Sequence, residues 1–108
     1  MSDAALPALV WCPVPDRQAG ETLAKWLLDE HLIACANILP AMHSLFVWNG
    51  EAGEATEAGM LLKTNMALLD RVIARIGQLH PYEEPAILGW PCPAASPGTV
   101  AWLGALPQ

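Results

Sequence analysis

Apolar positions along the chain form runs of strand length and repeats of helical spacing. The strand-like runs, which are rich in branched and aromatic residues, occupy residues 6–14, 33–48, 56–64 and 86–90. Between them, two longer segments carry apolar side chains three and four residues apart, at residues 17–31 and 66–79. Trp26 is expected to widen the buried face of the first of these helices. A short helix over residues 99–106, with Trp102 and Leu103 as apolar anchors, is predicted to follow the last strand.

Capping and turn residues mark the boundaries of these elements. Asp16 and Asn65 are suitable N-caps for the two longer helices, because their side chains accept hydrogen bonds from free backbone N–H groups. Pro40 interrupts the second strand, and since proline cannot donate to a sheet ladder we expect a bend or bulge at Pro40-Ala41. Asn49-Gly50 then predicts a tight hairpin into the third strand.

The predicted order β-α-β-β-α-β plus a C-terminal helix is that of the ferredoxin-like fold. We therefore expect an α+β domain over residues 1–108, with an antiparallel sheet and its helices on one face. Two strands as long as those joined at Asn49-Gly50 would extend beyond the body of so small a domain. Such an arm, like the uncovered sheet face, is expected to contact other subunits.

Composition supports association with other copies of the chain. Apolar residues make up 54% of the sequence and charged residues 15%, compared with roughly 25% charged residues in an average soluble domain. A monomer this apolar would expose a large apolar surface, and such surfaces usually mark contacts between subunits. Five tryptophans agree with this interpretation, because large aromatic side chains are enriched at interfaces. The sequence predicts a homo-oligomer.

Charge and cysteine content exclude several classes of protein. The formal net charge of −6 makes nucleic acid an unsuitable partner. No apolar run is long enough to span a membrane, and the first residues lack the pattern of a signal peptide. The three cysteines, Cys12, Cys35 and Cys92, are odd in number and never two residues apart, so a disulfide framework is not expected. We therefore expect a cytoplasmic protein with reduced thiols.

The hexapeptide His80–Pro85 brings an imidazole, a phenol and two carboxylates together on a stiff segment. Pro81 and Pro85 push the residues before them, His80 and Glu84, towards extended backbone geometry. The segment therefore cannot continue the preceding helix, and it is a candidate functional site. The alternative is a plain proline-rich connector between a helix and a strand.

Several segments together resemble the CutA family of divalent-cation tolerance proteins. They lie in the family's order and spacing across nearly the whole chain. The matching pieces are Cys12 with Pro15-Asp16, residues 32–40 (LIACANILP), residues 44–50 (SLFVWNG), residues 62–64 (LKT), residues 80–85 (HPYEEP) and Trp102-Leu103. The resemblance implies a stable trimer of ferredoxin-like subunits with hairpins paired across subunit boundaries, and a link to copper and other divalent ions.

The resemblance also implies metal contacts at Cys12 and His80, whose thiol and imidazole suit copper or zinc. Two ligands do not make a tight site, so Glu83, Glu84, water or a neighbouring subunit would have to complete it. We therefore expect Cu(II) or another divalent cation to be weakly bound. Each residue has a structural alternative: Cys12 as a small core residue, and His80 as a partner for the last carbonyl groups of the helix.

Four further residues, Asn37, Trp48, Lys63 and Tyr82, match signature positions of the family, and with Trp102 they are expected to line the interface or an inter-subunit cleft. Lys63 lies on a mostly apolar strand and needs an anionic partner. We expect Glu83 or Glu84 to provide it across a subunit cleft, where a small anionic ligand could also bind. Cys35 is expected in the core, Cys92 exposed, and His31 and His43 on the surface.

The chain departs from the family pattern at two polar positions. Ala86 stands where the family usually has a glutamate, and Leu79 stands where some metal-binding members have a second histidine. The leading hypothesis is a cytosolic homotrimer that binds copper and contributes to metal tolerance. The alternative is a PII-like signalling or small-ligand-binding trimer with ligands in its clefts. No catalytic motif or nucleophile–base set points to an enzyme.

Overall fold

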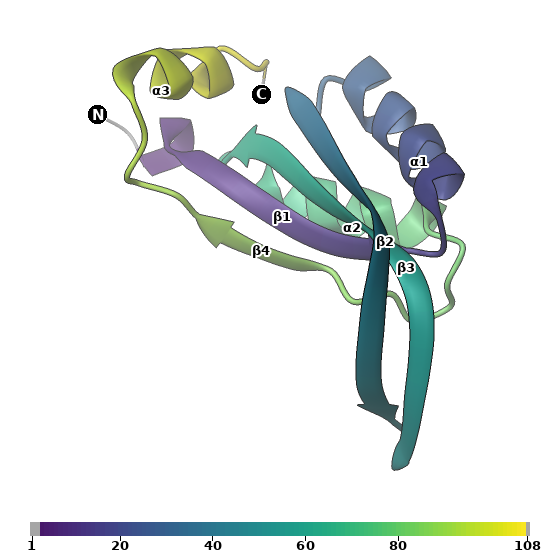
Figure 1. Cartoon of the computed structure of the whole chain (residues 1–108). Helices are drawn as coiled ribbons and strands as arrows, with labels where there is room; N and C mark the ends of the chain where they lie inside the picture. The colour runs from purple at the N-terminus through teal and green to yellow at the C-terminus, as the bar shows by residue number, and fades with distance from the viewer. Residues whose placement is uncertain (1–2, 108) are drawn as a thin grey trace.

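The computed structural model describes residues 3–107 and has the ferredoxin-like α+β architecture predicted from the sequence. Along the chain the elements are η1 (Asp3–Ala5), β1 (Pro7–Val14), α1 (Arg17–Asp29), β2 (Cys35–Trp48), β3 (Glu51–Asn65), α2 (Leu69–Leu79), β4 (Leu88–Pro91) and α3 (Pro97–Gly104). The four strands form one antiparallel sheet in the order β2-β3-β1-β4. Figure 1 shows α1 and α2 on one side of this sheet and α3 beside its end.

Alternate side chains of β1, one of the two inner strands, lie on opposite faces of the sheet. This strand pairs with β3 along its whole length and with β4 over residues 8–11. Ala8, Val10, Cys12 and Val14 have no exposed surface, because every second side chain points into the core beneath the helices. The residues between them lie on the other face of the sheet. Opposite β1, α1 contributes Leu23 and Leu27, and α2 contributes apolar side chains at helical spacing, including Val72 and Ile76.

The hairpin β2–β3 continues beyond the body as a two-stranded arm, which Figure 1 shows projecting away from the helices. The bulge predicted at Pro40-Ala41 is confirmed, because the β2–β3 register shifts between Leu39 and Met42 and Ala41 has a φ of 63°. The turn at the tip is also confirmed. Asn49 and Gly50 have φ values of 52° and 78°, which two-residue hairpin turns require.

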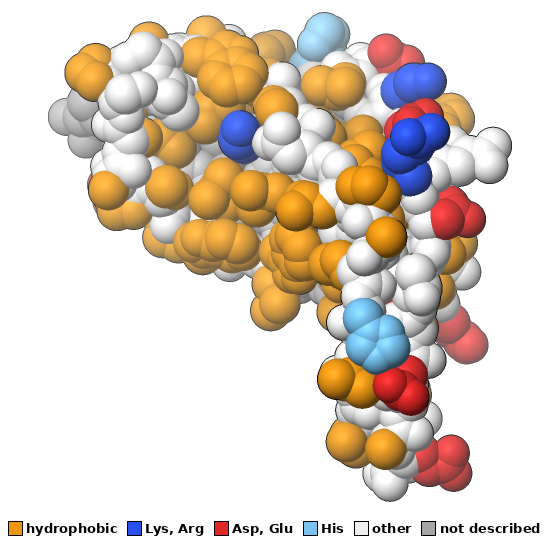
Figure 2. Space-filling model, viewed as in Figure 1, with side chains coloured by type: hydrophobic (Ala, Val, Ile, Leu, Met, Phe, Trp, Pro, Cys, Tyr) orange, Lys and Arg blue, Asp and Glu red, His pale blue; other side chains and the backbone are white. Residues whose placement is uncertain are grey.

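The sheet face opposite α1 and α2 is apolar and largely uncovered, and we call it the open face. Figure 2 shows hydrophobic side chains spread over β1 and β4 on this side. Leu39 is 49% exposed, Leu88 59% and Trp90 40%. Lys63 lies among these apolar neighbours, paired in register with Leu9 of β1 and Cys35 of β2.

Two expectations about the first helix are wrong. The helix ends at Asp29 instead of reaching His31, whose φ of 58° is incompatible with helix continuation. Trp26 does not widen the buried face, because it points to solvent with 52% of its surface exposed. The Asp16 cap is confirmed: its carboxylate accepts a hydrogen bond of 2.8 Å from the backbone N–H of Ala19.

Other boundaries differ from the predicted ones. Asn65 is the last residue of β3 instead of the N-cap of α2. Its Oδ1 accepts a hydrogen bond from the N–H of Leu68 in the turn before the helix, and its Nδ2 donates to the Leu103 carbonyl of α3. The third strand begins at Glu51, the last strand runs over Leu88–Pro91 with all four residues exposed, and the last helix begins at Pro97.

Gly59 provides a test of packing on the open face. A Cβ atom built there would lie 2.3 Å from the Trp11 ring and 2.8 Å from the Met42 sulfur. We expect Gly59→Ala to lower the free energy of unfolding by about 1–3 kcal/mol through overpacking. The matched control is Gly77→Ala in α2, whose Cβ would meet only Ile87 at 4.0 Å. It should raise stability by about 0.5–1 kcal/mol, as helix propensity requires. Equal effects in denaturant unfolding would contradict the packing argument.

Candidate functional site

His80 connects the hexapeptide to the end of β1. It follows the last residue of α2 with an extended backbone (φ −67°, ψ 138°), as expected for a residue before proline, and its side chain is buried. Its Nε2 lies 2.8 Å from the Pro13 carbonyl oxygen, and its Nδ1 lies 3.0 Å from the backbone nitrogen of Tyr82. A carbonyl only accepts and an amide N–H only donates, so Nε2 carries the proton and the Nδ1 lone pair is occupied.

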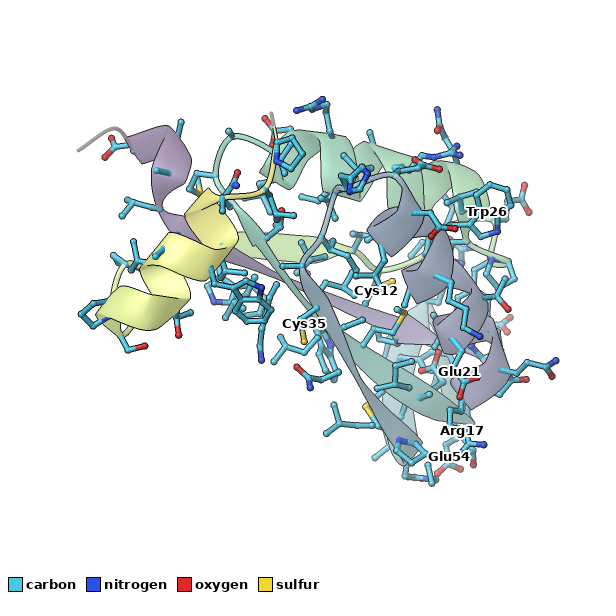
Figure 3. All side chains as sticks on the ribbon, turned by 90° about the horizontal axis from the view of Figure 1, so that it is seen from above. Cys12, Arg17, Glu21, Trp26, Cys35 and Glu54 are labelled. Carbon is cyan, nitrogen blue, oxygen red and sulfur yellow. The ribbon has the colours of Figure 1, made fainter. Side chains whose placement is uncertain are left out.

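Cys12 lies on the helix side of the same strand. Figure 3 labels it between the sheet and the helices. Its thiol has no exposed surface and donates weakly to the Pro13 carbonyl, 3.5 Å from Sγ. Burial, and then the nearby charge of Glu57, raise the pKa of the Cys12 thiol to about 12. Cys12 and His80 therefore converge on one carbonyl group as a protonated thiol and an imidazole N–H.

This arrangement does not fit a metal site. A metal ligand must be a thiolate or an imidazole nitrogen with a free lone pair, and neither is available here. In the described range 3–107, no three His, Cys, Asp or Glu side chains are placed to hold one ion. Glu83 and Glu84 are both exposed. The structure thus brings Cys12 and His80 together without the two carboxylates, and the core role considered for Cys12 is the one it has.

Tyr82 makes the next contact of the hexapeptide. Its hydroxyl group donates a hydrogen bond of 2.7 Å to Oε2 of Glu57 on β3, and its ring centroid lies 4.8 Å from that of His80. Burial, and then the Glu57 carboxylate, raise the pKa of the Tyr82 phenol to about 12. Sequence reasoning missed Glu57. The available signal was its position, a carboxylate directly before the apolar residues 58–62 of β3.

A cavity of about 510 Å³ opens between the base of the arm and the hexapeptide, and we call it the arm cavity. Its lining residues come from the end of β1, both arm strands and the loop after α2. They are Pro13, Ser44, Phe46, Val47, Trp48, Ala55, Glu57, Tyr82, Glu84, Pro85 and Ala86. The predicted site residues Trp48, Tyr82 and Glu84 thus meet at one place within a single chain.

The remaining predicted site residues lie elsewhere. Lys63 is on the open face and makes no ion pair with any residue in the range 3–107, so its pairing with Glu83 or Glu84 stays a prediction about the assembly. Asn37 is exposed on β2, where its Oδ1 lies 3.6 Å from the Cys35 sulfur. Trp102 is 48% exposed on α3, whereas its neighbour Leu103 is buried.

Cys35 is half-buried at the start of β2 and is not part of the core cluster, so the expectation of a core position is wrong.

Comparison with known proteins identifies the family. The sequence model described as CutA1 divalent ion tolerance protein matches residues 8–105. The chain belongs to this family. The divalent-cation tolerance protein CutA of Pectobacterium atrosepticum is 32% identical over 107 residues, which cover 97% of each chain. The solved structure of the Thermus thermophilus divalent cation tolerance protein has a TM-score of 0.85 and 34% identity, covering 91% of this chain and 95% of its own.

A plant relative of this CutA1 family member is longer. The protein named chloroplastic CutA of Arabidopsis thaliana is 31% identical over 103 residues, which cover 94% of this chain and 57% of the plant protein. The chain therefore spans little more than half of that relative. Among residues 3–107, no helix is both long enough and apolar enough to cross a membrane.

Titration of Tyr82 tests the contact with Glu57. Tyr82 is the only tyrosine in the sequence, so the near-ultraviolet absorbance of tyrosinate reports it alone. We expect a midpoint near pH 12 in the folded protein, and a shift towards the ordinary value of 10.0 in Glu57→Gln. Because folding raises this pKa, the phenol contributes stability below pH 10 that is lost as the pH rises to about 12.

The matched control is Glu51→Gln, which removes an exposed carboxylate at the arm tip and should leave the titration unchanged. Circular dichroism recorded at each pH shows whether the protein is still folded. A wild-type midpoint near 10.0 with the fold intact would contradict the Tyr82–Glu57 contact.

Proposed function

We propose that this protein acts in divalent-cation tolerance as a cytosolic homotrimer. The observation that carries the proposal is the open face, an apolar sheet surface that α1 and α2 leave uncovered. Leu39, Leu88 and Trp90 are exposed there, and burial of apolar area is the main driving force of association. The relatives, which are named for divalent-cation tolerance, support the cellular role.

The two edges of the sheet also favour assembly. β2 and β4 are the edge strands of the sheet, and among residues 3–107 no further strand pairs with their outer sides. Unpaired strand edges readily pair with another chain. The arm extends one of these edges beyond the body, so that a neighbouring copy can pair with it. Lys63 would then find its anionic partner on a neighbouring subunit.

The cysteines support a reducing compartment. Cys12, Cys35 and Cys92 are all free, and Cys12 is enclosed in the core. Proteins of oxidising compartments usually pair their cysteines. The Arabidopsis relative is named as chloroplastic, but this name describes a protein longer than this chain.

A binding role fits the site better than catalysis. The high pKa of the Cys12 thiol makes it a poor nucleophile at neutral pH, since the thiolate is the reactive form. The imidazole of His80 already bonds two backbone groups, so neither ring nitrogen is free to contact a substrate. We therefore propose a protein that binds its ligand without transforming it.

We further propose that Cu(II) binds weakly at accessible imidazole and carboxylate groups, and not at Cys12 and His80. His43 on β2 lies 3.0 Å from Oε1 of Glu54 on β3, and both side chains are about two-thirds exposed (64% and 65%). Nitrogen and oxygen ligands of this kind suit Cu(II). Two protein ligands leave the remaining positions to water or a neighbouring copy, which agrees with weak binding.

The arm cavity favours a second candidate function, a PII-like or small-ligand-binding trimer. Its volume of about 510 Å³ lies in the range of roughly 300–1,000 Å³ found for small-molecule sites. Aromatic rings line it together with two carboxylates. This is the usual composition of a ligand pocket, in which an apolar wall carries a few polar groups.

Light scattering tests the homotrimer. The wild-type protein at micromolar concentration should have three times the mass of one chain. Leu88→Asp places a charge on the open face at a residue that is 59% exposed in the single chain, so it should dissociate the trimer without unfolding the subunit. The matched control, Leu28→Asp, changes a 40% exposed leucine on α1 and should keep the trimer mass. A wild-type mass of one chain would overturn the proposal.

Calorimetric titration with Cu(II) tests the metal site. We expect His43→Ala to weaken binding by about tenfold or more, since it removes a direct ligand. Cys12→Ser should leave the affinity unchanged. The control His31→Asn removes another exposed imidazole, away from the arm, and asparagine tolerates the positive φ at that position. Loss of binding in Cys12→Ser, with His43→Ala unaffected, would instead support the buried pair.

A further inference from the structure

The charged side chains that line the arm cavity are all acidic. Two of its lining residues, Glu57 and Glu84, carry carboxylates, and none of the lining residues described is a lysine, arginine or histidine. The three ion pairs found in residues 3–107 involve neither carboxylate. Negative charge at this wall is therefore not neutralised by a salt bridge within the chain.

Tyr82 uses one oxygen of the Glu57 carboxylate. The phenol donates a hydrogen bond to Oε2 at 2.7 Å. The raised pKa of Tyr82 means that the phenol stays neutral at physiological pH. The second carboxylate oxygen of Glu57 takes no part in this bond and remains available to a ligand.

Aromatic rings supply the rest of the recognition surface. Phe46 and Trp48 of β2 and Tyr82 of the hexapeptide line the same cavity, and all three are substantially exposed, at 46%, 58% and 36%. The face of an aromatic ring attracts a cation, and indole does so most strongly. Aromatic faces combined with carboxylates are the chemistry that recognises ammonium groups.

The same features argue against other ligands. A hydrated metal ion needs several oxygen, nitrogen or sulfur ligands, but much of this wall consists of rings, prolines and alanines. An anion would be repelled by Glu57 and Glu84. A weakly hydrated organic cation loses little on leaving water and gains contacts with both the rings and the carboxylates.

We propose that the arm cavity binds a small organic ammonium ion, held between the Trp48 and Tyr82 rings with its charge towards Glu57 and Glu84. This inference rests on the second candidate function, ligand binding, and specifies the chemical class of the ligand. It does not depend on the Cu(II) site, because His43 and Glu54 are not among the residues that line the cavity.

Calorimetry and two-dimensional NMR with tetramethylammonium chloride test the proposal, with tert-butanol as an uncharged probe of similar shape and sodium chloride at equal ionic strength. We expect tetramethylammonium to bind, with shifts of the Trp48 indole and Tyr82 ring signals. Glu57→Gln keeps an acceptor for the Tyr82 hydroxyl but removes the charge, and Trp48→Leu removes the ring. Each should weaken binding by about fivefold or more.

Glu51→Gln is the matched control, because it removes a carboxylate of β3 that does not line the cavity, and its affinity should equal that of the wild type. Thermal unfolding shows whether each variant is folded. Equal binding of tert-butanol, or equal loss in Glu51→Gln and Glu57→Gln, would overturn the ammonium site. Absence of binding to a protein of trimer mass would overturn it as well and indicate that a neighbouring copy fills the cavity, while leaving the proposed trimer and Cu(II) site intact.

Discussion

The sheet of this protein is apolar on both faces, but its two longer helices, α1 and α2, cover only one. β1 shows the consequence most clearly, since Val10 and Cys12 are fully enclosed beneath the helices while Leu9 and Trp11 point the other way. At about 25 cal/mol per Å² of buried apolar surface, even part of the open face provides several kcal/mol for association. The proposed assembly, in which a neighbouring copy covers this face, would account for the high apolar content, the exposed Trp90 and the lack of an ion pair to Lys63 among residues 3–107.

His80 determines the geometry of the site by joining three parts of the chain. Its ring links the end of β1, through Pro13, to the backbone of Tyr82, and Tyr82 in turn contacts Glu57 at the base of the arm. A buried histidine that bonds two backbone groups is costly to replace, since both partners would lose a hydrogen bond. The same two bonds occupy both ring nitrogens of His80, so the contacts that hold the hexapeptide beside β1 leave neither nitrogen free for a metal ion.

Local signals predicted the fold well because each acts within a few residues. Asn49-Gly50 specifies its own turn, Pro40 its own bulge, and Asp16 its own cap. Contacts between residues far apart in the sequence were harder to predict. Glu57 contacts the hexapeptide only through a partner 25 residues away. Asn65 is not the N-cap of α2 because β3 extends to Asn65 and the helix begins only at Leu69. Trp26 is exposed although its spacing suggested burial, because helical spacing identifies the centre of an apolar face much better than its edge.

The departures from the family pattern change the chemistry available around the hexapeptide. Ala86 lines the arm cavity, where a glutamate would add a third carboxylate and approach the number of ligands a metal site requires. Leu79 instead packs partly buried against the core at the end of α2, in a place where a histidine would present a second imidazole next to His80. With a methyl group at position 86, the wall of the arm cavity keeps two carboxylates and three aromatic rings. A metal ion needs more ligand atoms than this wall offers, whereas the proposed ammonium ion carries its own apolar surface and needs fewer.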